Sequence, residues 1–146
     1  MKSKAEIVVE TLLHYNIKNR GYNRAEGQCT YLDKSSGNKC AVGRCIQDSE
    51  IEKVCVFEQE QINQGNGSPS AAKLAANFND LDSLLSPEYR GHDYAFWGHL
   101  QFFHDSSYMW NEDGFDVSDG SLTYITRSFG AEVGEAVRVA LAEKTA

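Results

Sequence analysis

The stretch from Gly37 to Ile46, GNKCAVGRCI, lies where the sequence pattern changes from strand-like to helical. It follows a turn signal, Ser35–Asn38, that is typical of the connection between two strands. The small residues Ala41 and Gly43 indicate that another segment of backbone packs closely against it. We interpret the stretch as a junction between a β hairpin and a helical turn that opens at Cys40.

Outward from this junction, the hydrophobic pattern alternates between strand-like and helical. The segments Cys29–Asp33 (CTYLD) and Lys53–Phe57 (KVCVF) predict a small antiparallel β element near residues 29–57. Helical periodicity predicts about five helices, at residues 5–19, 68–86, 93–105, 122–129 and 131–144, while a polar flexible loop is expected at 63–70 and a further loop at 106–120. The sequence thus predicts an α+β, mostly helical, single compact domain over residues 1–146, with helix 131–144 as an added element and a candidate dimer face for a homo-oligomer.

Composition and charge restrict the class of protein. The 146 residues carry a formal net charge of −7, and the basic residues are scattered, which argues against bulk binding of nucleic acid. The apolar run after the N-terminal MKSKA is interrupted by Glu6 and Glu10, and no run approaches the roughly 20 apolar residues that span a bilayer. We therefore expect a cytoplasmic protein that makes no membrane contact, in which the four cysteines are free thiols, metal ligands or catalytic groups.

The spacing of the cysteines does not favour a metal site. Cys29, Cys40, Cys45 and Cys55 are separated by ten, four and nine residues, whereas structural zinc sites use two closely spaced pairs. On a helix, Cys40 and Cys45 would point about 140° apart. We assign no metal ligand and no cofactor, interpret Cys45 and Cys55 as buried apolar residues, and keep a structural zinc-binding module as an alternative.

A thiol-dependent enzyme is a second alternative. Cys40 opens a helical turn and follows Lys39, and both a helix start and a neighbouring cation lower the pKa of a thiol. His104 could serve as its base, and Asp105 follows His104 directly. The candidate catalytic residues are therefore Cys40, His104 and Asp105. The competing interpretation is that His104 is a buried core histidine and that Asp105 caps backbone amides instead of orienting it.

Anion binding is a further hypothesis for the same junction. Arg20, Arg24, Lys39 and Arg44 lie around the loop and hairpin, and the backbone amides of residues 40–43 could point at an anion. Gly43 would let a ligand or another backbone come close. The alternative is that these charges only solvate a loop.

Two separated motifs carry a resemblance to known proteins. They are Cys29-x-Tyr31 leading to Lys39-Cys40-Ala41-Val42-Gly43, and Leu100-Gln101 followed by His104-Asp105. Over residues 7–130 the chain resembles a family of small uncharacterised proteins of tailed phages and prophages. It departs from that family at residues 45–48 (CIQD), where a proline-containing stretch is usual, and in its final helix.

The resemblance implies a phage-encoded accessory protein that works in a bacterial host cytoplasm. Proteins of that class often bind a host or anti-phage-defence protein, or sequester a small nucleotide-like signal, so we expect a non-enzymatic binding module. Its candidate ligand-binding residues are Arg24, Lys39, Cys40, Gly43, Arg44, Gln101 and His104.

Overall fold

The computed structural model describes residues 1–20, 22–23, 28–106, 109–115 and 119–145. Its α-helices are α1 (Lys4–His14), α2 (Asp48–Asn63), α3 (Ala71–Asn77), α4 (Tyr94–Asp105), α5 (Asp119–Phe129) and α6 (Ala131–Thr145). Its strands are β1 (Tyr22–Asn23), β2 (Gln28–Cys29), β3 (Trp110–Asn111) and β4 (Gly114–Phe115), and two short 3-10 helices are η1 (Gly43–Cys45) and η2 (Pro87–Tyr89). The predicted mostly helical α+β class is confirmed. In the described residues, no helix has the length and apolar character needed to cross a bilayer.

Contacts divide the chain into two compact units. Unit 1 consists of Met1 and Asn19–Asp105, and unit 2 consists of Lys2–Lys18 and Ser106–Ala146. The expectation that residues 1–146 act as a single domain stays a prediction.

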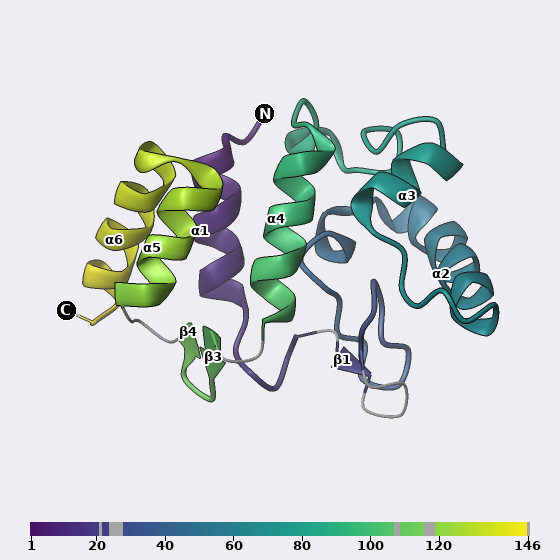
Figure 1. Ribbon diagram of the computed structural model, residues 1–146, viewed down its shortest axis with the longest axis horizontal. Coiled ribbons are helices and arrows are strands. Elements are labelled where there is room, and N and C mark those ends of the chain that lie inside the picture. The colour runs from purple at the N-terminus through teal and green to yellow at the C-terminus, as the bar shows by residue number, and fades with distance from the viewer. Residues whose placement is uncertain (21, 24–27, 107–108, 116–118, 146) are drawn as a thin grey trace. The chain divides into compact units, whose positions relative to one another are not determined.

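Unit 2 is a group of three helices, α1, α5 and α6, which lie side by side (Figure 1). The turn between α5 and α6 is made by Gly130, whose φ of +100° lies in the region that glycine adopts readily. One turn further on, a Cβ at Gly134 would stand 2.2 Å from Thr126 Oγ1, so these two helices approach more closely than a side chain would allow. The buried residues of the three helices include Ile7, Val8, Leu12, Ile125, Val133, Val137 and Leu141.

A hairpin in unit 2 corrects the prediction of a plain loop over residues 106–120. Strands β3 and β4 pair antiparallel, with Trp110 opposite Phe115. The turn between them ends in Asp113-Gly114, a dipeptide typical of hairpins. The chain after α1 joins this hairpin, because the Ile17 amide donates to the Asn111 carbonyl at 2.9 Å.

Unit 1 begins with a short antiparallel pair, β1 and β2, so the β element starts earlier in the chain than predicted. Within the predicted strand Cys29–Asp33, only Cys29 belongs to a strand, and Leu32 makes an isolated bridge with Lys39. The turn between those two residues is organised by Asp33, whose carboxylate accepts hydrogen bonds from the Ser35 and Ser36 hydroxyls at 2.8 and 2.7 Å. The chain then enters η1, as the junction interpretation predicts.

Helix α2 overturns the strand predicted at Lys53–Phe57, because these residues lie in its middle. The four apolar residues after Lys53, two of them β-branched, fit either type of structure when the run is considered alone. Over the longer stretch, the buried residues Val54, Cys55 and Glu58 follow a helical spacing. The helix therefore buries one stripe, whereas its other faces are mostly polar apart from the exposed Val56.

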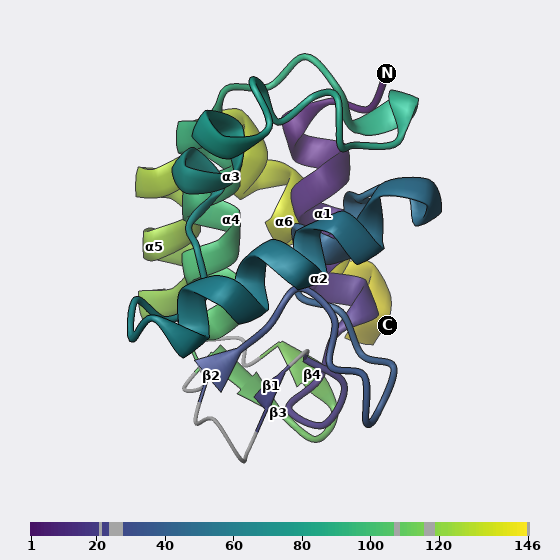
Figure 2. The same ribbon diagram turned by 90° about the vertical axis from the view of Figure 1, so that its right-hand side faces the viewer.

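Helix α3 is shorter than the predicted helix at 68–86. Ser70 caps its start by accepting from the Lys73 amide at 3.2 Å, and the helix ends at Asn77. The segment after it instead pairs with the connection between η1 and α2, where the Gln47 amide donates to the Leu84 carbonyl at 2.9 Å. Helices α3 and α4 contact each other within unit 1 (Figure 2).

Candidate functional site

The junction after the hairpin is tightly packed, as the sequence predicts. A Cβ at Gly43 would lie 2.0 Å from the Tyr31 carbonyl oxygen, so the neighbour that glycine admits here is another backbone. The Gly43 amide donates to the Cys40 sulfur at 3.3 Å, and the Val42 amide donates to the Gln101 side-chain oxygen at 3.4 Å. These amides are engaged within the chain, which does not support the hypothesis that they point at an anion.

The Cys40 thiol is fully buried at this junction. Burial raises the pKa of Cys40 well above the ordinary value for a thiol, and the Asp105 carboxylate raises it further. The predicted lowering of this pKa is therefore wrong. The reason is that the thiol faces the interior, while the Lys39 ammonium lies 3.7 Å from the Asp48 carboxylate.

His104 and Asp105 pair with each other at the end of α4. His104 Nδ1 lies 2.8 Å from Asp105 Oδ1, so the expectation that Asp105 caps amides instead of orienting the imidazole is wrong. His104 is buried, as its core interpretation predicts, and this burial lowers its pKa although Asp105 acts in the opposite direction. Arg20 closes the helix end by donating to the carbonyl oxygens of His104 and Asp105 at 3.1 and 3.2 Å.

Asp105 acts on each of the other two predicted catalytic residues. It is hydrogen-bonded to His104, and its charge raises the pKa of Cys40. A nucleophilic cysteine needs a stable thiolate, and this environment stabilises the protonated thiol. The catalytic assignment of Cys40, His104 and Asp105 stays a prediction.

Two of the other predicted cationic residues, Lys39 and Arg44, have partners within the chain. Arg24 lies outside the described residues. Lys39 is close to Asp48, and Arg44 donates to the Tyr89 hydroxyl at 3.3 Å with its guanidinium 5.8 Å from the ring centre. The assignment of these residues to ligand binding stays a prediction.

Glu58 is a buried carboxylate that the sequence analysis missed. It accepts hydrogen bonds from the Tyr31 amide at 3.3 and 3.2 Å and from the Ser68 hydroxyl. The Tyr31 hydroxyl in turn donates to the Pro69 carbonyl at 2.6 Å. Together these bonds tie α2 to the connection that leads into α3. The helical spacing of residues 54, 58 and 62 places Glu58 on the buried face. The strand predicted at 53–57 ends before Glu58, so this spacing was not recognised.

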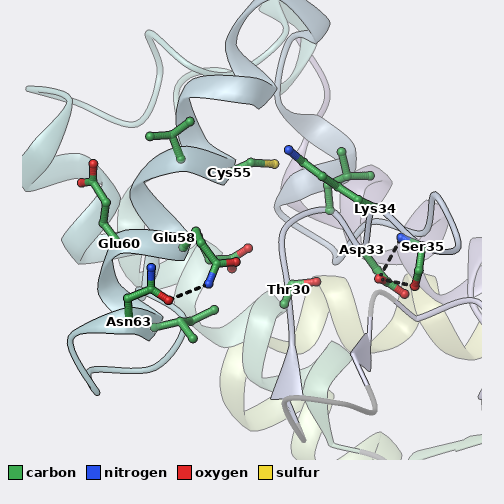
Figure 3. A pocket seen from close by; sticks show the side chains of 12 residues that line it. Thr30, Asp33, Lys34, Ser35, Cys55, Glu58, Glu60 and Asn63 are labelled. Carbon is green, nitrogen blue, oxygen red and sulfur yellow. Dashed lines mark hydrogen bonds between the residues drawn. The ribbon is translucent and has the colours of Figure 1, made fainter.

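A groove of about 610 Å³ lies between α2 and residues 30–35, and we call it the α2 groove (Figure 3). Its lining residues are Thr30, Leu32, Asp33, Lys34, Ser35, Cys55, Val56, Glu58, Gln59, Glu60, Ile62 and Asn63. Cys55 and the ammonium of Lys34 point toward each other across it (Figure 3). Burial, and then the nearby Glu58 carboxylate, raises the pKa of the Cys55 thiol.

A second groove of about 350 Å³, the α4 groove, contains two of the predicted residues. Gln101 and Asp105 line it from α4, and the Gln101 amide donates to the Asp105 carboxylate at 3.2 Å. The remaining lining residues are Gly98 and Phe102 from α4 and Ser68, Pro69, Ser70 and Ala71 from the start of α3. The buried Cys40, Gly43 and His104 do not line it.

Among the described residues, no group of three or more histidine, cysteine or acidic side chains is arranged to hold a metal ion. Comparison with known protein families, with curated proteins and with solved structures finds no match for this chain.

Proposed function

We propose that this protein is a non-enzymatic binding module, and that its α2 groove holds a basic, partly apolar segment of a partner protein. The observation that carries the proposal is the lining of the groove, in which apolar side chains and carboxylates share one surface. The apolar members are Leu32, Val56 and Ile62, and the acidic members are Asp33, Glu58 and Glu60.

The charge of the groove favours a cationic ligand. Among the described residues that line the groove, Asp33, Glu58 and Glu60 are acidic and one, Lys34, is basic, and the Lys34 ammonium lies 3.1 Å from the Glu52 carboxylate. Hydrogen bonds from Ser36, then from Ser35, lower the pKa of Asp33, which keeps that carboxyl ionised near neutral pH. A phosphate group would be repelled by such a surface. The lining therefore favours the protein partner over the nucleotide-like signal that the sequence also suggested.

The size and polarity of the groove are suitable for binding a peptide segment. A volume near 610 Å³ lies within the range of about 300–1,000 Å³ that ligand sites occupy. Val56 is 51% exposed although it lies on α2 beside the buried Cys55, so an apolar ligand atom placed on it would be removed from water. The Gln59 and Asn63 amides, at the polar edge, are hydrogen-bonded to each other at 2.9 Å and offer further donors and acceptors.

The remaining parts of the proposal rest on the phage resemblance. We place the protein in a bacterial host cytoplasm as a phage-encoded accessory protein, and its partner among host or anti-phage-defence proteins. The buried Cys40 thiol, with its raised pKa, supports a binding role over thiol catalysis.

The proposal is tested by selecting peptides from a random displayed library on the immobilised protein and measuring the affinity of the enriched peptides by calorimetry. We expect lysine or arginine beside apolar residues. Glu60→Lys should weaken binding about fivefold, equivalent to about 1 kcal/mol, and more strongly at low salt. Val56→Asp should also weaken it.

Matched controls are Asp48→Lys, which reverses a 99% exposed charge on the same helix outside the groove, and Val139→Asp on α6. Both should bind like the unchanged protein. Enrichment of peptides without basic residues, equal effects of Glu60→Lys and Asp48→Lys, or saturable binding of nucleotides that Glu60→Lys strengthens would each overturn the proposal.

A further inference from the structure

The α4 groove is lined in part by Gly98, a glycine that the fold does not require. Gly98 lies inside α4, where glycine is less favourable than alanine. A Cβ at this position would have no described atom within 4 Å apart from its chain neighbours and the backbone of its own helix, and the φ of Gly98 is not positive. This contrasts with Gly43, which a neighbouring backbone makes necessary. The absence of a side chain at Gly98 leaves space in the groove.

An exposed aromatic ring stands beside this space. Phe102 follows Gly98 by four residues, which places both on one face of α4, and its side chain is 55% exposed. A flat group lying over Gly98 would therefore meet the ring of Phe102. Both aliphatic chains and planar cations pack favourably against such a ring.

The charge of the groove favours a planar group that is positively charged. Among the described residues that line it, Asp105 is the one that carries a charge. Its carboxylate is held by His104 Nδ1 at 2.8 Å and by the Gln101 amide at 3.2 Å, and its side chain is still 41% exposed. A carboxylate fixed in this way is prepared to accept hydrogen bonds from a cation, and it repels phosphate.

We infer that the α4 groove is a binding site for an arginine side chain presented by a partner protein. The guanidinium is planar and forked, so it can stack on Phe102 and donate to the Asp105 carboxylate at the same time. The aliphatic stem of the arginine crosses the opening at Gly98. A lysine ammonium can satisfy the carboxylate but not the stacking position. This site is distinct from the α2 groove, because no described residue lines both, although Ser68 of the α4 groove donates to Glu58 of the α2 groove.

The test titrates the isotope-labelled protein with N-acetyl-arginine amide and follows its amide resonances by NMR. We expect saturable shifts at Gly98 and at the Gln101 side-chain amide. N-acetyl-lysine amide and the uncharged isostere N-acetyl-citrulline amide should bind about fivefold or more weakly. Equal binding of citrulline amide, or no shift at these residues with arginine amide, would overturn the inference.

Two variants separate the site from a chance surface. Gly98→Ala fills space in the groove without a clash, so its melting temperature should equal or exceed that of the unchanged protein while arginine amide binds about fivefold more weakly. Phe102→Ala should also weaken binding. Its matched control is Tyr94→Ala, which removes a 59% exposed aromatic ring from the same helix outside the groove. Unchanged affinity in Gly98→Ala, or equal losses in Phe102→Ala and Tyr94→Ala, would contradict the inference, as would preferential binding of guanosine at the same residues.

Discussion

The backbone of Gly43 lies against the carbonyl oxygen of Tyr31 so closely that a Cβ at residue 43 would stand 2.0 Å from that oxygen. Neither partner can move aside by changing a side-chain rotamer, because the obstacle is main chain. Gly43→Ala should therefore lower the free energy of unfolding by about 3 kcal/mol, measured by urea denaturation. Gly98→Ala, in open space on α4, is the control and should raise it by about 0.5–1 kcal/mol. Equal effects of the two substitutions would show that the close approach is not rigid.

The hydroxyl of Tyr31 anchors the connection between α2 and α3. It donates to the Pro69 carbonyl at 2.6 Å in a buried position. Tyr31→Phe would leave that carbonyl without this donor, so we expect the free energy of unfolding to fall by about 1–2 kcal/mol. Tyr94→Phe removes a hydroxyl from an exposed ring and should change it by less than about 0.5 kcal/mol. The contrast fails if both variants unfold at the urea concentration of the unchanged protein.

Stability should depend on pH through His104. Burial lowers its pKa in the folded protein, whereas an unfolded histidine titrates near about 6.5. Below that pH the unfolded chain binds a proton that the folded chain does not. The free energy of unfolding should therefore decline as the pH falls from about 6.5 toward the folded pKa, by at most about 1.4 kcal/mol per pH unit.

Denaturation of His104→Asn across the same pH series isolates this contribution, since the substitution removes the titrating ring. We expect a smaller slope between pH 6.5 and the folded pKa in that variant. His99→Asn, at an exposed position on α4, should keep the slope. A slope that survives His104→Asn would assign the pH dependence to other groups.

The thiol of Cys40 should resist alkylation in the folded protein. It is fully buried, and its pKa is raised by that burial and by Asp105. Mass spectrometry after iodoacetamide treatment over a pH series should find it modified much more slowly than the same cysteine in urea. Rapid modification of native Cys40 at neutral pH would instead revive the thiol-enzyme alternative.

Much of the helical framework was predictable because long amphipathic segments carry a strong periodic signal. The predicted helices at 93–105 and 131–144 lie within one residue of α4 and α6. The predictions for short segments were wrong. Lys53–Phe57 has strand-like residues, but tertiary packing selects the helix through the buried stripe that includes Glu58. The hairpin at Trp110–Phe115 was missed although Asp113-Gly114 carries its turn signal.

The candidate site was predictable only in part. The motif that contains Gln101 and Asp105 does line a groove, and Cys45 is buried as expected. The direction of the Cys40 pKa could not be read from its neighbours in sequence. It depends on whether the thiol faces solvent or core, which is decided by contacts with segments such as α4, some sixty residues away. No sequence motif predicts the α2 groove, because the two segments that line it have an ordinary composition.

The division of the chain between its two units has a consequence for biosynthesis. Unit 2 joins residues 2–18 to residues from 106 onward, and α1 contacts α6. The apolar side chains of α1, among them Ile7, Val8 and Leu12, therefore wait for a helix that begins only at Ala131. At roughly 5–20 residues per second, a ribosome needs several seconds to make the intervening chain. Helix α1 is thus made well before the helix α6 that contacts it, and during that interval its apolar side chains are a binding surface for chaperones.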